Sequence, residues 1–206
     1  MGREVLAALL TDKRYAAVHC VGRRPLPLTH PRLISHVISF DKLDTLPGLK
    51  HVDDVFIALG TTIKVAGSEA AFRAVDFDAV LAVARAAKSA GATRLGVVSA
   101  MGASLGSAIF YNRVKGEMED ALAKLAFETL IIARPSMLAG DRDALAQPAR
   151  AGERLILPAM RLFKPLIPAN YRAISARAVA QALVRAVQET DHGQRILLSG
   201  QMQAKL

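Results

Sequence analysis

Short apolar segments rich in β-branched residues alternate along this chain with longer segments whose apolar residues recur at helical spacing. The short segments span 16–22, 33–39, 54–60, 94–100, 129–135 and 195–199, and the helical ones span 3–10, 68–90, 111–125 and 176–188. Strands that alternate with helices pair in parallel, because each helix carries the chain back across the sheet. The alternation therefore predicts an α/β fold with a doubly wound parallel sheet and helices on both faces.

Composition excludes several classes of protein. Of the 206 residues, 52% are hydrophobic and 22% are charged, which is too apolar for a disordered chain. No apolar run reaches the roughly 18–20 residues that cross a bilayer, so we expect no transmembrane helix. The single cysteine, Cys20, excludes an intrachain disulfide, and its place in an apolar run predicts a core residue. One cysteine and no secretory signal at residues 1–6 favour a cytoplasmic location.

The net charge of +9 indicates an anionic partner, which would be nucleic acid, an anionic membrane or a phosphorylated small molecule. Aromatic residues make up only 5% of the chain and do not alternate with basic ones, which argues against nucleic acid. Residues 154–167 mix basic and apolar side chains as a membrane-surface helix does, but Pro158, Pro165 and Pro168 interrupt any long helix there. Peripheral membrane contact is therefore not favoured, and we expect a small-molecule partner.

Tyr111 and Lys115 stand four residues apart in a segment of helical pattern. This spacing places both side chains on one face of a helix, one turn apart. An ammonium close to a phenol favours the phenolate and lowers the tyrosine pKa from its ordinary value of about 10, so the phenol becomes usable as an acid or base near neutral pH. A surface tyrosine and a surface lysine show the same spacing by chance, so the pair alone does not identify a site.

Ser99 lies near the end of the apolar run 94–100, twelve residues before Tyr111. Doubly wound sheets bind ligands at the carboxyl ends of their strands, where a serine hydroxyl is placed to hydrogen-bond a substrate carbonyl. A serine at a strand end also commonly caps a turn or a helix. Ser104 and Ser107, in the same expected loop, are the alternatives for this role.

The order of strand, Ser99, loop and Tyr111-x-x-x-Lys115 resembles the short-chain dehydrogenase/reductase superfamily, and more narrowly its atypical branch that includes the Tat-interacting-protein oxidoreductases. The resemblance runs from residue 2 to about residue 185. It implies a Rossmann-like, dinucleotide-binding fold in which Ser99, Tyr111 and Lys115 are the catalytic residues. Four further stretches agree with that branch, namely 21–24, 58–62 with Gly67, 110–117 and 133–136.

The resemblance also implies which residues hold the cofactor. Arg23 and Arg24 follow the first strand, where an acidic residue would hold the 2′-hydroxyl of NAD and an arginine the 2′-phosphate of NADP. The expected cofactor is therefore NADP(H), with NAD(H) as the alternative. Asp41 matches the family position near the adenine. The remaining cofactor-binding positions are Gly2, Leu59, Gly60, Thr61, Thr62, Lys115, Arg134, Pro135 and Ser136.

Without the resemblance, the same residues have simpler interpretations. The two arginines are then an exposed basic loop, residues 60–62 are an ordinary turn, and Pro135 ends a strand. With it, the chain divides into a dinucleotide-binding core at 1–140, a substrate-covering lobe at 141–175, and a returning helix and last strand at 176–206.

In this family a strand and a Gly-rich turn come before the first helix, whereas this sequence opens on the helical segment 3–10. We therefore expect the first strand and most of the Gly-rich turn to be missing from it, with Gly2 as the last glycine of that turn. A central strand buries many apolar side chains and the turn binds the pyrophosphate, so both folding and cofactor binding are expected to suffer.

The expected function is NADP(H)-dependent oxidation or reduction at a carbonyl or alcohol centre. Tyr111 would donate or accept the proton, Lys115 would lower the tyrosine pKa and hold the ribose, and Ser99 would orient the carbonyl. The alternative is a non-catalytic NADP(H)-binding regulatory or sensor protein. No metal is expected, because none of the five histidines has a partner at metal-ligand spacing.

Overall fold

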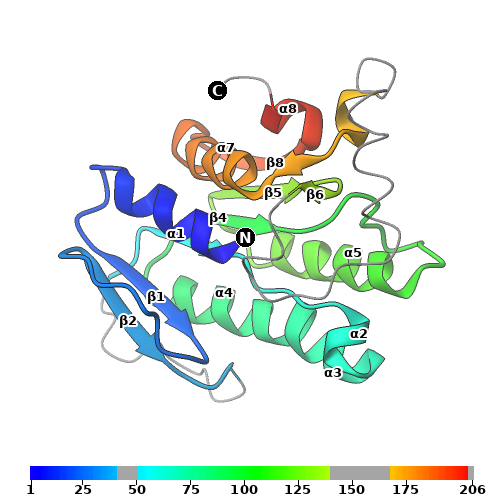
Figure 1. Cartoon of the computed structure of the whole chain (residues 1–206), viewed down its shortest axis with the longest axis horizontal. Coiled ribbons are helices and arrows are strands. Elements are labelled where there is room, and N and C mark those ends of the chain that lie inside the picture. Colours follow the sequence, from blue (N-terminus) through cyan, green and yellow to red (C-terminus); the bar gives the residue numbers. More distant parts are fainter. Residues whose placement is uncertain (41–50, 140–167, 204–206) are drawn as a thin grey trace.

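The structure is a computed structural model that describes residues 1–40, 51–139 and 168–203 (Figure 1). The expected Asp41, and most of the expected lobe at 141–175, lie outside these residues. None of the described helices is both long enough and apolar enough to cross a bilayer. The elements are α1 (Gly2–Thr11), β1 (Val18–Gly22), β2 (Leu33–Val37), β3 (Asp54–Ile57), α2 (Ile63–Ala66), α3 (Glu69–Arg73), η2 (Ala74–Asp78), α4 (Ala79–Ser89), β4 (Arg94–Val98), α5 (Phe110–Ala123), β5 (Thr129–Arg134), β6 (Leu138–Ala139), η5 (Ala169–Tyr171), β7 (Ile174–Ser175), α7 (Ala176–Glu189), β8 (Gly193–Leu198) and α8 (Ser199–Gln203).

Every strand pair among the described residues is parallel. The strands β3, β4, β5 and β8 form one sheet in that order, β1 and β2 form a second, and the short β6 and β7 form a third. In register, Val97 of β4 lies between Ile57 of β3 and Ile132 of β5. The predicted α/β fold with a parallel sheet is confirmed, and all six predicted strands are present with ends shifted by a few residues.

Helices cover both faces of the four-stranded sheet (Figure 1). Ile131 and Ile132, neighbours on β5, point to opposite faces and are both fully buried. One core contains apolar residues of α4 and α5, and the other contains those of α7, with α1 beside α7. A strand buried on both faces has no polar side, which is why these strands read in the sequence as continuous apolar runs.

The segment 68–90, expected as one helix, is instead interrupted by a π-helical turn. Ser68 begins it, because its hydroxyl accepts a hydrogen bond from the Ala71 N–H at 3.1 Å. The π-turn η2 contains Asp76, which is fully buried. One extra residue in a single turn leaves helical spacing intact on either side, so the apolar pattern does not reveal the interruption.

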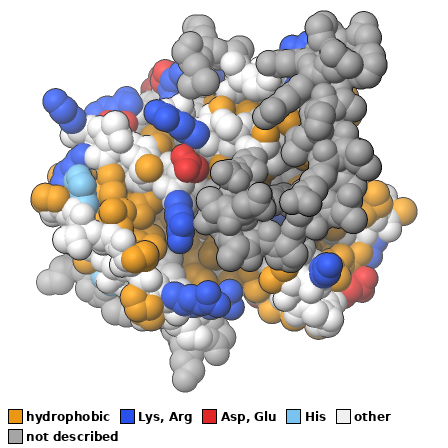
Figure 2. All heavy atoms as spheres, in the orientation of Figure 1, with side chains coloured by type: hydrophobic (Ala, Val, Ile, Leu, Met, Phe, Trp, Pro, Cys, Tyr) orange, Lys and Arg blue, Asp and Glu red, His pale blue; other side chains and the backbone are white. Residues whose placement is uncertain are grey.

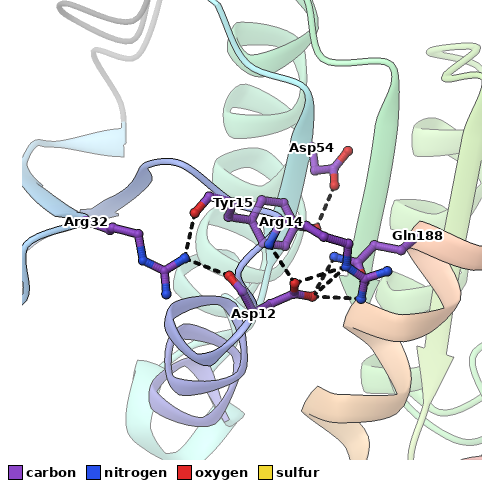
Figure 3. Close-up of polar contacts among 6 residues, drawn as sticks. All are labelled: Asp12, Arg14, Tyr15, Arg32, Asp54 and Gln188. Carbon is purple, nitrogen blue, oxygen red and sulfur yellow. Dashed lines mark hydrogen bonds and ion pairs between the residues drawn. The ribbon is translucent and has the colours of Figure 1, made fainter.

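A polar network joins the starts of β1 and β3 at the amino edge of the sheet (Figure 3). The Tyr15 hydroxyl donates to one oxygen of Asp54 at 2.6 Å, as Figure 3 shows. The Arg94 guanidinium donates to the other Asp54 oxygen at 2.6 Å. Arg32 donates to three backbone carbonyl oxygens at and beyond the end of α1. Burial and the bond to Asp54 raise the pKa of Tyr15 well above its ordinary value, so this hydroxyl keeps its proton.

Candidate active site

The residues singled out in the sequence meet at the carboxyl edge of the four-stranded sheet. Gly60 follows β3, Ser99 follows β4, and Arg134 ends β5. These three strands are parallel neighbours, so their carboxyl ends lie at one edge. The helix α5 begins after the loop that follows β4, which brings its first turns, with Tyr111 and Lys115, to the same edge.

Lys115 forms a buried ion pair with Asp76 of the π-turn. Lys115 is 3% exposed, and its Nζ lies 2.7 Å from Asp76 Oδ1. The second Asp76 oxygen accepts a hydrogen bond from the Thr61 N–H at 2.8 Å. Gly60 leaves room for the pair, since a Cβ there would lie 3.3 Å from Asp76 Oδ1 and 3.9 Å from Lys115 Nζ. The pair therefore holds the ammonium beside the turn 60–62.

Tyr111 lies one turn before Lys115 on α5 and is partly buried. Its ring packs against Phe72 of α3, with the ring centroids 5.4 Å apart. Phe72 is itself fully buried and also contacts Phe110 at 5.9 Å between centroids. This packing orients the tyrosine ring, and the helical spacing places it on the same side of α5 as Lys115.

Ser99 is buried where β4 ends, and its hydroxyl donates to the carboxylate of Glu119. Glu119 is 5% exposed and also accepts from the Arg134 guanidinium, with 3.0 Å between Nε and Oε1. A serine hydroxyl carries one proton, so this bond uses the only donor of the Ser99 side chain. In this conformation Ser99 completes the Glu119–Arg134 pair, and its hydroxyl must rotate before it can donate to another acceptor.

The loop between β4 and α5 lies directly against the helix. Gly116 permits this contact, because a Cβ there would lie 2.6 Å from the backbone nitrogen of Leu105. The Ser104 N–H donates to the carbonyl oxygen of Asn112 at 3.1 Å, which ties the loop to the first turn of α5. Ser104 is exposed and Ser107 is partly exposed, so both alternative serines lie in this loop near the start of the helix.

The residues expected at the far end of a cofactor lie on the β1 side of the molecule. Arg23 and Arg24 follow β1 and are exposed, and Gly2 begins α1 and is exposed. The exposed guanidinium groups are free of ion pairs with acidic residues among the described residues. They are thus accessible to an anionic group of a ligand.

The remaining expected residues have structural partners. Thr62 caps α2 by accepting the Val65 N–H at 3.2 Å, and Leu59 packs against the core beneath the turn. The N–H of Ser136 donates to the Ser199 hydroxyl at 2.7 Å, and the buried Pro135 precedes it. These contacts fix the backbone of two loops at the carboxyl edge.

Two acidic residues of this site, Asp76 and Glu119, were not identified in the sequence analysis. Glu119 had a usable signal, because it follows Lys115 by four residues and therefore shares the helix face of Tyr111 and Lys115. Asp76 had none, since its inward direction depends on the π-turn. Both acids neutralise a basic residue of the edge, so the site holds paired charges rather than isolated ones.

Known proteins with related sequences are HTATIP2 of Rattus norvegicus and the mitochondrial protein FMP52 of Coccidioides immitis. The first is 32% identical over 204 residues, which cover 96% of this chain and 81% of the rat protein. The second is 35% identical over 156 residues, which cover 69% of this chain and 63% of the fungal protein. No family profile matches the chain.

Solved structures with a similar fold include a carbonyl reductase from Pseudomonas aeruginosa PAO1 in complex with NADP and a UDP-glucose 4-epimerase from Thermotoga maritima. The reductase has a TM-score of 0.61 and 17% identity, over 95% of this chain and 90% of its own. The epimerase has a TM-score of 0.69 and 14% identity, over 97% of this chain and 74% of its own. At this level of identity the likeness shows the fold.

Sheet order and flanking helices, together with these similar structures, place the chain in the Rossmann-like fold class. Within that class, the alignment to the rat protein, which covers 96% of this chain, identifies the family. The chain belongs to the family of HTATIP2 and FMP52. The family that the motifs resembled is thereby confirmed.

The comparisons contradict the cytoplasmic location expected from the sequence. Several FMP52 relatives are named as mitochondrial proteins, from Coccidioides immitis, Emericella nidulans and Eremothecium gossypii among others. The expectation was wrong because it rested on one unpaired cysteine and on the lack of a secretory signal. A single unpaired cysteine and the composition of residues 1–6 do not distinguish among the compartments of a cell.

Proposed function

We propose that this protein is an NADP(H)-dependent oxidoreductase that acts on a carbonyl or alcohol group of a small molecule. One observation carries the proposal: the buried Asp76 holds the Lys115 ammonium at 2.7 Å, one helical turn from Tyr111 and beside the turn 60–62. Burying an ammonium is costly without a fixed counter-charge. The buried Asp76 supplies that counter-charge and fixes the position of the Lys115 ammonium in the site.

The residues present suit a nicotinamide dinucleotide. A Cβ at Gly60 would close the space beside Lys115 and Asp76, and the exposed glycine backbone leaves the turn open to a ligand. An ammonium donor suits a ribose hydroxyl. When bound, the cofactor supplies or receives the hydride.

The catalytic roles follow from the chemistry of each side chain. Tyr111 gives a proton to the carbonyl oxygen in reduction and takes it back in oxidation. The positive charge of Lys115 favours the phenolate form of Tyr111 when the proton leaves. Ser99 orients the carbonyl once its hydroxyl turns away from Glu119, and Ser104 or Ser107 of the neighbouring loop are the alternatives for that donor.

A preference for NADP(H) is part of the proposal, with NAD(H) as the alternative. Arg23 and Arg24 are exposed where β1 ends, and no acidic residue stands beside them in the sequence. A guanidinium binds phosphate through two parallel donors, so these arginines suit a 2′-phosphate better than a 2′-hydroxyl. The Pro135–Ser136 turn and Leu59 are proposed to line the cofactor with their backbone.

Replacing the phenol tests the proposal. Tyr111→Phe keeps the ring that packs on Phe72 and removes only the hydroxyl. We expect turnover of a carbonyl panel to fall by a factor of at least about 100, with little change in NADPH affinity, because only the proton transfer is lost. Tyr15→Phe is the matched control, since Tyr15 lies at the opposite edge of the sheet, and it should retain turnover. Full activity of Tyr111→Phe would remove the phenol from the mechanism.

A non-catalytic NADP(H)-binding regulator is the second candidate. The bond from Ser99 to Glu119 favours it, because that bond occupies the donor that would orient a substrate. Measuring NADPH binding and NADPH consumption side by side distinguishes the oxidoreductase from the regulator. A regulator binds NADPH and changes its contacts with another protein, without consuming NADPH in the presence of any carbonyl.

A further inference from the structure

A groove of about 370 Å³ lies between α1 and α7. The two helices lie side by side (Figure 1), and Val5 and Leu6 of α1 pack with Val184 of α7. One stripe of each helix lines this α1–α7 groove, with the small side chains of Ala7 and Ala8 on the α1 side. None of the described residues assigned to the candidate active site lines it, so the groove is a separate feature of the surface.

Three arginine side chains border the α1–α7 groove. Arg177 and Arg185 belong to α7, and Arg14 follows α1. Arg14 is neutralised by Asp12 at 2.8 Å, whereas Arg177 and Arg185 form no ion pair with an acid of the described residues. Lys and Arg side chains are spread over the face of the molecule that carries α1 (Figure 2). The remaining carboxylate of the groove is Glu4, so the two arginines of α7 are available to carboxylates of a partner.

Two glutamine side chains of α7 hold buried amide oxygens in the same groove. Gln188 donates from Nε2 to Asp12 Oδ2 at 2.9 Å (Figure 3). An ionised carboxylate only accepts, so the amide nitrogen of Gln188 faces Asp12 and the amide oxygen faces away from it. Among the described residues, neither Gln188 Oε1 nor Gln181 Oε1 has a hydrogen-bond partner, and both atoms are buried. Buried acceptors require donors, so a ligand of this groove carries N–H or O–H groups.

We propose that the α1–α7 groove is a docking site for an acidic segment of a partner protein, bound in an extended, polyproline II-like conformation. The carboxylates of the segment lie against Arg177 and Arg185. Its backbone N–H groups donate to the amide oxygens of Gln181 and Gln188. This site does not depend on the proposed oxidoreductase function.

The spacing of the two amide oxygens supports an extended backbone. Gln181 and Gln188 are seven residues apart on α7, which is about 10 Å along a helix axis. A polyproline II segment has three residues per turn and rises about 3.1 Å per residue, so N–H groups three residues apart point the same way at about 9 Å. Its N–H groups have no internal partners, whereas those of an α-helix are used within the helix.

A polypeptide fits this groove better than a phosphate-bearing partner does. Phosphate groups of nucleic acids and lipids bind arginine, but their oxygens are acceptors and cannot satisfy the amide oxygens of Gln181 and Gln188. An acidic polypeptide supplies carboxylates for the arginines and N–H donors for the amides within one chain. The combination of free cations with buried acceptors therefore selects the polypeptide.

Fluorescence anisotropy of a labelled acidic peptide tests the proposal. The probe is a peptide of about twelve Glu and Ser residues, about four polyproline II turns long. We expect binding in the micromolar range at low salt, and Arg177→Glu and Arg185→Glu should each weaken it at least about fivefold. Glu4→Gln should strengthen binding, because a like charge is removed. Arg85→Glu is the matched control, since Arg85 is exposed on α4, on the other face of the sheet, and it should bind as the wild type does.

The same peptide with N-methyl groups on its backbone tests the amide contacts. N-methylation keeps every carboxylate and removes the N–H donors, so binding should weaken at least about tenfold. Gln181→Leu removes one buried acceptor and leaves the arginines in place. In that variant the difference between the plain and the N-methylated peptide should become smaller. An undiminished difference would refute the contact with Gln181.

Two results would overturn the docking site as a whole. The first is no binding of the plain peptide up to about 1 mM, or equal weakening by Arg185→Glu and the control Arg85→Glu, which would reflect net charge alone. The second is tighter binding of single-stranded DNA or of phosphatidylserine vesicles, with the same dependence on Arg177 and Arg185. That result would assign the groove to a phosphate-bearing partner.

Discussion

At the scale of single residues, the site is organised by two buried acids rather than by the residues with the recognisable spacing. Asp76 fixes Lys115 and the Thr61 N–H together, and Glu119 fixes Ser99 and Arg134 together. Each acid connects groups from two elements. The positions of Lys115 and Ser99 at the edge therefore depend on partners that the motif itself does not contain.

Removing the charge of Asp76 is expected to destabilise the protein strongly. Asp76→Asn keeps an oxygen for the Thr61 N–H but leaves the Lys115 ammonium buried without a counter-charge, which costs about 3 kcal/mol or more. The free energy of unfolding from denaturant titration measures the loss. NADPH affinity should fall as well, because the ammonium is no longer held beside the turn 60–62.

Asp120→Asn is the matched control for this change. Asp120 also pairs with a lysine, Lys124, at 2.7 Å, but the side chains of Asp120 and Lys124 are 41% and 74% exposed. An exposed pair of this kind contributes about 0.3–0.5 kcal/mol. Equal losses in the two variants would contradict a special role for the buried pair.

At the scale of elements, the fit between the loop after β4 and the helix α5 decides where Ser99 and Tyr111 lie relative to each other. Gly116 is the point of closest approach. Gly116→Ala is expected to push the loop away, with a loss of about 1–3 kcal/mol in the free energy of unfolding and lower turnover. Gly106→Ala, in the same loop with open space around it, should change neither quantity. Wild-type turnover and stability in Gly116→Ala would show that the contact does not position the site.

The pairing of β1 with β2 introduces a pH dependence. His19 Nδ1 lies 2.9 Å from His36 Nε2, and burial, followed by the nearby His36, lowers the pKa of His19 below its ordinary value of 6.5. The unfolded chain therefore binds this proton at a higher pH than the folded chain does. Stability contributed by the neutral His19 is fully present above pH 6.5 and declines as the pH falls through the window below it.

Thermal unfolding of His19→Gln measures this contribution. Between about pH 7.5 and about pH 5.5, the Tm of the variant should fall less than that of the wild type, because the group that takes up the proton is gone. His192→Gln changes an exposed histidine in the turn before β8 and is the control. A variant Tm that falls as steeply as the wild-type Tm would exclude His19 as the source.

The elements predictable from sequence are those long enough to show a period. The strands at 94–98 and 129–134 are apolar runs between turns, and the helix at 176–189 repeats its apolar face over several turns. The two-residue strands β6 and β7, and the short helices α2 and α8, have no room for a period. The π-turn at 74–78 interrupts the segment that was expected as one helix, and it contains the buried Asp76 of the site.

At the scale of the whole molecule, an apolar groove lined by α1, β1, β3 and α4 separates the pair β1–β2 from the four-stranded sheet. The alternation of strands and helices predicts the parallel sheet, because that pattern depends on local spacing. The gap between β1 and β3 depends on which strands are neighbours in space, and local spacing does not determine this. The motifs predict that Tyr111, Lys115 and Ser99 lie at one edge of the sheet. They do not predict the hydrogen bond from Ser99 to Glu119, because it depends on how α5 packs beside β4.

The most direct measurement of the proposed function is the transfer of deuterium from NADPH labelled at nicotinamide C4 to a panel of aldehydes and ketones, followed by mass spectrometry of the alcohols. The wild-type protein should give a deuterated alcohol from at least one carbonyl, and Tyr111→Phe should give at least about 100-fold less of it while it still binds NADPH. Tight NADPH binding by the wild type without a deuterated alcohol from any carbonyl would contradict hydride chemistry at this edge of the sheet.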